Sequence, residues 1–388
     1  MLRRFAEFDW THLAEPWANG SFPWDFDLVQ PRARDPQYQL LPTSGIAANG
    51  KPILDWVGAA AQITRESDGW SVILGAGTSV TYAYRLAAPA IMPEGTSGFS
   101  QFSAAQIAAT ETAIALWESV ANVDFVRVGA GYANNATILF GNYFAGAPDA
   151  SAFAFFPGSR AAGSVDGDVW VNISLATNLD LSLGAFGLQI LAHEIGHAIG
   201  LSHPGDYNGG APTYELSASY WQDSRAFTIM SYFGSPNVGG NLPGFSAGPQ
   251  LHDIAAVQRL YGANVNTRVG DTIYGFNSNT GLAHYSISSA TQGVVFAIWD
   301  GGGNDTLDLS GYSENADIDL REESHSSAGP TPDNGPATFN MSIARGAVIE
   351  NGIGGAGDDT LTGNDVANRL EGRAGIDTLI GGGGTDTL

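Results

Sequence analysis

The chain has 388 residues, no cysteine, and 39 acidic against 16 basic residues, which gives a formal net charge of −23. This length allows two or more domains, and the lack of cysteine excludes disulfides, thiolate metal ligands and a cysteine nucleophile. The negative charge disfavours nucleic-acid and anionic-membrane partners but suits hard cations such as calcium.

Two features concern export and membranes. No run of about 18 or more apolar residues is present, so stable membrane insertion is not expected. The first residues lack the continuous apolar segment of an ordinary secretory signal, so an exported protein would need another route.

Residues 1–49 are rich in Trp, Pro and Asp and show no sustained helical or strand period. We expect them to form an extension, either disordered or packed on the rest. From about residue 50 the pattern is mixed α/β. Ser103 and Gln106 have capping-box spacing, which predicts a helix from 103 to about 120. Further helices are expected at 186–199 and 251–260, and strands at 70–74, 80–86, 124–128, 137–140, 152–156 and 168–173.

A metal-binding pattern lies in the expected helix at 186–199 and in the residues just after it. His193 and His197 stand at i and i+4, so they share one helix face, and Glu194 lies beside them. Gly200 permits a left-handed turn that brings His203 round as a third ligand. Three protein ligands with an open fourth position are typical of catalytic zinc. A buried helix that merely contains histidines is the alternative, which the added Gly and third His disfavour.

The C-terminal part contains a nine-residue repeat. Residues 354–362 match G-G-x-G-x-D-x-U-x, where U is a large apolar residue, and the frame begins again at residues 363, 372 and 381. Tight glycine turns, an inward apolar residue and a metal-binding Asp explain this pattern. If two repeats form one turn, each repeat lies over the next but one, with calcium between them. A flexible linker is the alternative, but linkers do not keep Leu361, Leu370, Leu379 and Leu388 in phase.

These motifs, together with His203-Pro204-Gly205-Asp206-Tyr207-Asn208 and Ile229-Met230-Ser231-Tyr232, resemble the serralysin family of bacterial metzincin endopeptidases. The resemblance implies an α+β chain: a metzincin zinc-protease domain with a twisted mixed sheet and long helices at 50–262, then an all-β parallel β-roll of RTX repeats at 263–388. Because the chain stops inside a repeat, we expect a fragment truncated at its C-terminus. The family is secreted from Gram-negative bacteria by a type I (ABC) exporter and hydrolyses protein or peptide substrates.

By resemblance, His193, His197 and His203 bind one catalytic zinc and Glu194 is the general base. Tyr232 is a zinc ligand at rest and an oxyanion stabiliser, with a half-buried aromatic as the alternative, and Met230 forms the hydrophobic floor. His252 stands where relatives have an acidic residue, so it receives no role.

Several structural calcium ions are implied in the same way. One would bind Arg268, Gly270, Thr272, Asp300, Gly302 and Asp305, and a neighbour would bind Gly303, Asp305 and Glu350. In the regular repeats, Gly355, Gly357 and Asp359 would face Gly372, Ala374 and Asp377, while Asn364, Val366 and Asn368 would face Gly381, Gly383 and Asp386. The neutral Asn368 is expected to bind more weakly than Asp359.

The segment Ala152, Phe153, Ala154, Phe155 and Phe156 resembles the edge strand beside which metzincins bind an extended peptide, although an ordinary sheet strand is the alternative. Residues 1–49 are either a passive extension or a propeptide in the cleft, in which case Asp9, Asp25 or Asp27 would approach the zinc. The rival function is a calcium-dependent surface or matrix-binding protein with an inactive protease-like domain.

Overall fold

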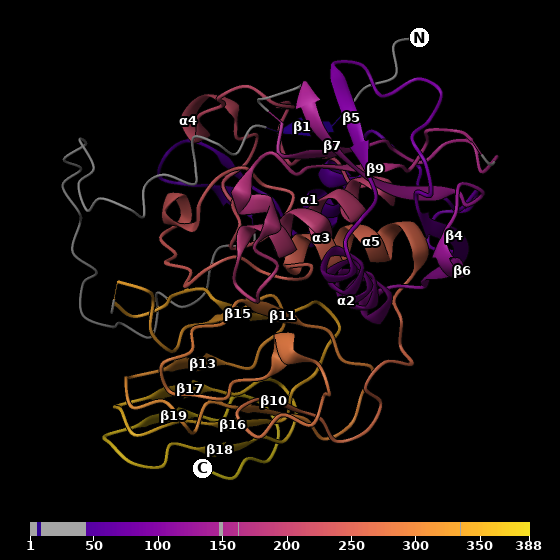
Figure 1. Cartoon of the computed structure of the whole chain (residues 1–388). Coiled ribbons are helices and arrows are strands. Elements are labelled where there is room, and N and C mark those ends of the chain that lie inside the picture. Colours follow the sequence, from indigo (N-terminus) through magenta and orange to yellow (C-terminus); the bar gives the residue numbers. More distant parts are fainter. Residues whose placement is uncertain (1–5, 9–43, 147–149, 162, 334) are drawn as a thin grey trace.

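The computed structural model describes residues 6–8, 44–146, 150–161, 163–333 and 335–388, so Asp9, Asp25 and Asp27 lie outside the described residues. Figure 1 shows two parts. The helices and one large sheet occupy the part drawn from indigo to salmon, and short strands from residue 273 onward fill the orange and yellow part. None of the helices in the described ranges has the length and apolar character of a membrane span.

The large sheet contains seven strands in the order β1-β8-β9-β7-β4-β6, with β5 paired to β7. The pairs β4–β6, β4–β7 and β7–β9 are parallel, and β5–β7, β8–β9 and β1–β8 are antiparallel. The strands are β1 Ala6–Phe8, β4 Thr78–Tyr84, β5 Thr96–Ser100, β6 Val123–Tyr132, β7 Ile138–Gly146, β8 Ala152–Ala154 and β9 Val169–Asn172.

The helices of this part are α1 Trp56–Ile63, α2 Ala104–Val120, α3 Phe186–Ala198, α4 Tyr214–Ser217 and α5 Leu251–Tyr261, and a small hairpin joins β2 Gly45–Ile46 to β3 Pro52–Ile53. Short 3-10 helices lie at Ala176–Leu179, Ser235–Val238 and Ala283–Tyr285. The predicted capping box of α2 is confirmed, because Ser103 and Gln106 exchange both hydrogen bonds.

The predicted strand at 70–74 is wrong. Trp70 is buried and its Nε1 donates to Ala198 O at 2.7 Å, whereas the side chain of Val72 is fully exposed. The Ser71 hydroxyl bonds the backbone of Ile73 and forms a local turn instead of a strand. The apolar residue at position 70 is therefore explained by its packing against α3 and not by membership of the sheet. The structure also contains β1, β5 and α1, which the sequence pattern did not predict.

Helix α3 lies at the centre of this part, and all of its residues are buried. Three side chains from other elements bond its backbone: Trp117 Nε1 donates to Ala192 O at 3.0 Å, Trp70 Nε1 to Ala198 O, and Tyr261 Oη to Ile199 O at 2.6 Å. The last two satisfy carbonyls at the helix C-terminus that have no partner within the helix. These bonds therefore hold the C-terminus of α3 in place, where the loop that contains His203 begins.

The C-terminal strands pair between repeats. Leu361 pairs with Leu379, and Gly352 with Leu370, so each strand lies in parallel beside the strand two nine-residue repeats further on. The strands form one sheet in the order β10-β12-β16-β18, a second in the order β13-β17-β19 and a third in the order β11-β15-β14. Their bounds are β10 Ile273–Gly275, β11 Phe296–Ile298, β12 Thr306–Asp308, β13 Asp317–Asp319, β14 His325–Ser326, β15 Met341–Ile343, β16 Asn351–Ile353, β17 Thr360–Thr362, β18 Arg369–Glu371 and β19 Thr378–Ile380.

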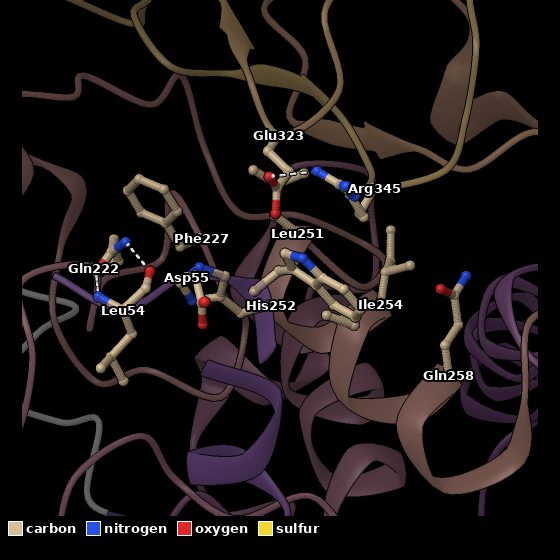
Figure 2. Close-up of a pocket in the computed structure, with 12 residues that line it drawn as sticks. Leu54, Asp55, Gln222, Phe227, Leu251, His252, Ile254, Gln258, Glu323 and Arg345 are labelled. Carbon is tan, nitrogen blue, oxygen red and sulfur yellow. Dashed lines mark hydrogen bonds and ion pairs between the residues drawn. The ribbon is translucent and has the colours of Figure 1, made fainter. Parts of the chain in front are cut away.

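The two parts share one hydrophobic core. At their junction, Phe227 lies between two buried histidines, with ring centroids 5.2 Å from His252 and 4.7 Å from His325. The Nε2 atom of His325 donates to Ala226 O at 3.0 Å. Figure 2 shows the cavity beside this cluster, lined by His252 and Phe227 and, from the C-terminal part, by Glu323 and its ion-pair partner Arg345.

The two histidines predict a pH dependence of stability. Burial lowers the pKa of His252 to about 3, with a further contribution from His325, and lowers that of His325 to about 4, both below the ordinary 6.5. Both neutral forms therefore stabilise the fold above pH 6.5, and this contribution is lost as the pH falls toward 4. We expect the unfolding free energy of the doubly substituted chain H252Q/H325Q to change less between pH 6.5 and 4.5. The difference is at most about 1.4 kcal/mol per pH unit for each histidine. Denaturant titrations at several pH values measure the unfolding free energy, and an equal dependence on pH in the wild type and the double variant would contradict this.

Candidate zinc active site

The structure brings the three predicted histidines together. His193 and His197 project from α3, and His203 follows the turn at Gly200, whose φ of 108° confirms the expected left-handed conformation. The Nε2 atom of His203 lies 3.0 Å from Nε2 of His197 and 3.3 Å from Nε2 of His193. Among the described residues, they form the only group of three or more His, Cys, Asp or Glu residues whose ligand atoms all lie within 4.8 Å of one another.

Each imidazole is oriented through its other nitrogen. The Nδ1 atoms of His193, His197 and His203 bond the backbone carbonyls of Ile229 (2.7 Å), Leu201 (2.6 Å) and Tyr207 (2.9 Å). A carbonyl only accepts, so each Nδ1 carries the proton and each Nε2 presents its lone pair to the common centre. A tetrahedral zinc with bonds of about 2.0 to 2.1 Å needs nitrogen atoms about 3.3 Å apart, so this donor set fits zinc.

The protonation states agree with a metal site. Burial lowers the pKa of His193 to about 4 and holds the pKa of His197 and of His203 well below the ordinary 6.5, with neighbouring histidines adding to the effect on these two. All three rings are therefore neutral at pH 7, which is the form that binds metal.

Glu194 is buried beside the histidines on the same helix. Burial raises the pKa of its carboxyl group well above the usual range. Its Oε2 atom has no hydrogen-bond partner among the described residues. A buried carboxylate with a free oxygen can accept a proton from a water molecule at the centre of the site, as a general base must.

Tyr232 packs against His203, and Met230 packs against α3 at Gly196. The Tyr232 ring centroid lies 4.4 Å from that of His203, and its hydroxyl accepts the Gly209 N–H at 3.3 Å. Met230 is fully buried, and its Sδ atom would lie only 2.7 Å from a Cβ placed on Gly196. The glycine inside α3 therefore lets the methionine pack directly beneath the ligand helix.

Two carboxylates that the sequence analysis gave no role support this site. Asp223 Oδ1 accepts the hydroxyls of Tyr207 and Ser231, both at 2.7 Å, and the Tyr207 ring stacks on His203. Asp253 Oδ1 accepts Thr228 Oγ1 at 2.5 Å, and its Oδ2 accepts the N–H of Ile229 at 2.7 Å. Ile229 is the residue whose carbonyl orients His193. The only signal in the sequence was the capping-box position of Asp253 in α5, where it also accepts the Gln250 N–H.

The predicted substrate strand lies next to the zinc ligands. Residues 152–154 form β8, and Phe156 just beyond it packs edge-on against His197 with centroids 5.7 Å apart. Strand β8 pairs with β9 on one side and with β1 on the other.

The predicted calcium residues come together in pairs of loops. Asp305 Oδ1 accepts the Thr272 N–H at 2.7 Å, and Glu350 accepts the Asp305 N–H at 2.7 Å. In the repeats, Asp377 accepts the Asp359 N–H at 2.9 Å and Asp386 accepts the Asn368 N–H at 3.0 Å. Asp305 Oδ2 is buried without a partner among the described residues, and burial raises the pKa of this carboxyl to about 7, with Asp300 and Glu350 adding to the shift. These donor oxygens suit a hard cation.

Comparison with known proteins agrees with this geometry. The chain matches the Matrixin family over residues 94–219 and the family described as Peptidase M10 serralysin C terminal over residues 263–388. It is 44% identical to Metallopeptidase AprA of Pseudomonas marginalis over 338 residues, covering 84% of this chain and 69% of that protein. It is also 44% identical to Serralysin A of Dickeya chrysanthemi over 350 residues, covering 89% of this chain and 70% of the relative.

The fold and the three-histidine site thus define a zinc metalloendopeptidase of the metzincin type. The chain belongs to the serralysin family, and calcium is expected as its second metal.

The contacts of Asp253 allow a test of the residues that hold the zinc-site histidines in place. In D253N one carboxylate oxygen becomes an NH₂ group, so the side chain can no longer accept all three bonds from Thr228 Oγ1 and the N–H groups of Ile229 and Gln250. We expect zinc affinity to fall by about 10- to 100-fold, because the Ile229 carbonyl no longer holds His193 in place. Competition with a chromogenic chelator measures this, and D124N, at an exposed carboxylate, is the control. Unchanged affinity in D253N would contradict the positioning role.

Proposed function

We propose that His193, His197 and His203 hold the catalytic zinc, that Glu194 is the general base, and that Tyr232 assists the reaction on internal peptide bonds. The convergence of three Nε2 atoms, each oriented by a carbonyl, carries this proposal. The intact set of Glu194, the three histidines and Tyr232 disfavours the rival binding protein with an inactive protease-like domain.

The residues of the chain divide the work of hydrolysis. Zinc at this position supplies Lewis-acid polarisation and acidifies water. Glu194 takes the proton from the attacking water and later gives it to the leaving amine. Burial raises the pKa of this carboxyl group, which makes the carboxylate a stronger proton acceptor in the first transfer. Tyr232, which the resemblance makes a zinc ligand at rest, would direct its hydroxyl to the negative charge that develops on the carbonyl oxygen.

Substrate recognition is proposed for the strand at residues 152–156. An extended peptide that adds to β8 would gain main-chain hydrogen bonds and would lie beside Phe156 and His197.

The domain division is proposed at residues 50–262 for the protease and 263–388 for a calcium-binding parallel β-roll. The pairing of each repeat strand with the next but one supports a roll with two repeats per turn. The ligand groups are those named for each loop pair above. Secretion through a type I exporter from a Gram-negative bacterium is proposed from the family and the repeats. A secretion assay in cells with and without such an exporter tests it.

Removal of the base tests the reaction. E194Q removes the proton acceptor but leaves all three imidazoles, so we expect casein cleavage to fall by more than about 100-fold while zinc remains bound. A zinc chelator should abolish the wild-type activity, and D124N should cleave like the wild type. Equal, chelator-insensitive cleavage by wild type and E194Q would exclude the proposed mechanism.

The weaker repeat site tests the calcium proposal. The Asn368 amide is already bonded within its loop pair, because Oδ1 accepts Asn364 N at 2.8 Å and Nδ2 donates to Glu350 O at 2.9 Å. A carboxylate there would restore the charge present at Asp359. We expect N368D to raise, and D359N to lower, the calcium-induced gain in melting temperature of the full chain. No difference between the two variants in millimolar calcium (about 10⁻³ M) would contradict the assigned loops.

A further inference from the structure

The cavity of Figure 2 lies where the two parts of the chain meet. It has a volume of about 170 Å³, and its walls come from the start of α1, from α5 and from two residues of the C-terminal part. An apolar cavity of about 150 Å³ is large enough for one benzene ring. The cavity at the junction therefore accommodates a ligand with a single ring.

The buried part of the cavity wall is mainly apolar and carries no charge. The His252 ring lies beside Phe227, and it is neutral at pH 7 because burial lowers its pKa to about 3. The side chain of Gln222 is already bonded at both ends, to the Leu54 N–H at 3.1 Å and to the Leu54 carbonyl at 2.7 Å. The buried residues of the wall are Gln222, Phe227, Leu251, His252, Ile254 and Ala255. This part of the cavity offers contact surface to an uncharged ring.

The solvent-accessible part of the wall is charged. Nη1 of Arg345 lies 2.9 Å from Glu322 Oε1 and 3.4 Å from Glu323 Oε2, and its guanidinium lies over the Trp56 ring, 5.8 Å from the centroid. Burial raises the pKa of the Glu323 carboxyl, and the charges of Glu322 and Asp55 add to the rise. Three carboxylates around one guanidinium leave an excess of negative charge, and an exposed Trp face also attracts cations. The mouth of the cavity therefore favours a positive group.

We propose that the cavity binds a small primary amine that carries one apolar ring. The ring lies between Phe227 and α5, and the ammonium group lies at the mouth with Asp55, Glu323 and Trp56. Volume, an uncharged inner wall and a negative mouth together select this class of ligand.

The cavity lies next to the residues that hold one of the zinc-site histidines. The His252 N–H donates to Phe227 O at 2.9 Å, and the next residue, Asp253, accepts the Ile229 N–H. The Ile229 carbonyl in turn bonds His193. A ligand packed between Phe227 and α5 restricts the motion of these segments against each other, so we expect it to strengthen zinc binding. This effect, unlike the binding itself, rests on the proposed function of the three histidines.

An NMR titration tests the binding in the full chain with zinc and calcium present. With isotope-labelled tryptophan, the indole signal of Trp56, assigned with W56F, should shift on addition of benzylamine and saturate with a Kd of about 1 mM. The signal of Trp117, buried in α2, should not shift. Benzyl alcohol keeps the ring without the charge and benzoate reverses the charge, so affinity should fall in that order. Methylamine, which has the charge without the ring, should bind at least about tenfold more weakly than benzylamine.

The double variant D55N/E323Q is matched to this test. Asparagine keeps an acceptor for the Gly58 N–H, which Asp55 Oδ1 accepts at 2.7 Å at the start of α1, and glutamine keeps an acceptor for Arg345. We expect benzylamine to bind about tenfold more weakly and benzyl alcohol to bind as in the wild type. The control D124N should bind both like the wild type. An unshifted Trp56 signal, or equal benzylamine affinity in wild type and D55N/E323Q, would overturn the site.

Competition with a chromogenic chelator tests the effect on zinc. Saturating benzylamine should raise the zinc affinity of the wild type by about twofold or more and leave that of D55N/E323Q unchanged. Unchanged zinc affinity with a saturated cavity would overturn the link to His193. If benzylamine binds but the chain takes up no zinc, the cavity assignment holds and the proposed zinc site fails instead.

Discussion

Three hydrogen bonds between imidazole Nδ1 atoms and backbone carbonyls are the constraint on which the site depends. A histidine ring can rotate and can carry its proton on either nitrogen, so the bonds to Ile229, Leu201 and Tyr207 set both the tautomer and the direction of the free Nε2 lone pair. Two of these carbonyls, those of Leu201 and Tyr207, belong to the loop that follows α3, and the third belongs to Ile229 in a later segment. The geometry of the site is thus decided by how the segments around α3 are held, and not by α3 alone.

The holding groups connect the zinc ligands to the junction with the C-terminal part. Asp253 in α5 fixes Ile229, and its neighbour His252 packs on Phe227 together with His325. The carbonyl of Phe227 accepts the His252 N–H, so two successive residues of α5 bond the segment 227–232, which we call the Met230 segment. A change in the packing of the C-terminal part therefore has a short route to His193.

The proposed substrate strand, β8, has a different requirement. A strand that recognises peptides by main-chain pairing must keep one edge accessible, and such an edge pairs with any extended segment within reach. In this chain the segment within reach is β1. The three predicted zinc ligands are buried, whereas the outer edge of β8 pairs with a strand of only three residues.

The sequence by itself determined the local chemistry. The spacing of His193, His197 and His203 predicted that the three rings gather, Ser103 predicted the start of α2, and the nine-residue phase of Leu361 and Leu379 predicted which strands stack. Each of these depends on residues close in the chain or on a strict period. The tertiary structure decided what depends on distant partners. Trp70 bonds α3 instead of forming a strand, and Asp253 reaches the Met230 segment. Residues 6–8, which have no strand period of their own, become a strand because β8 offers an edge. No local pattern records such contacts, since their stabilisation comes from segments that meet only in the folded chain.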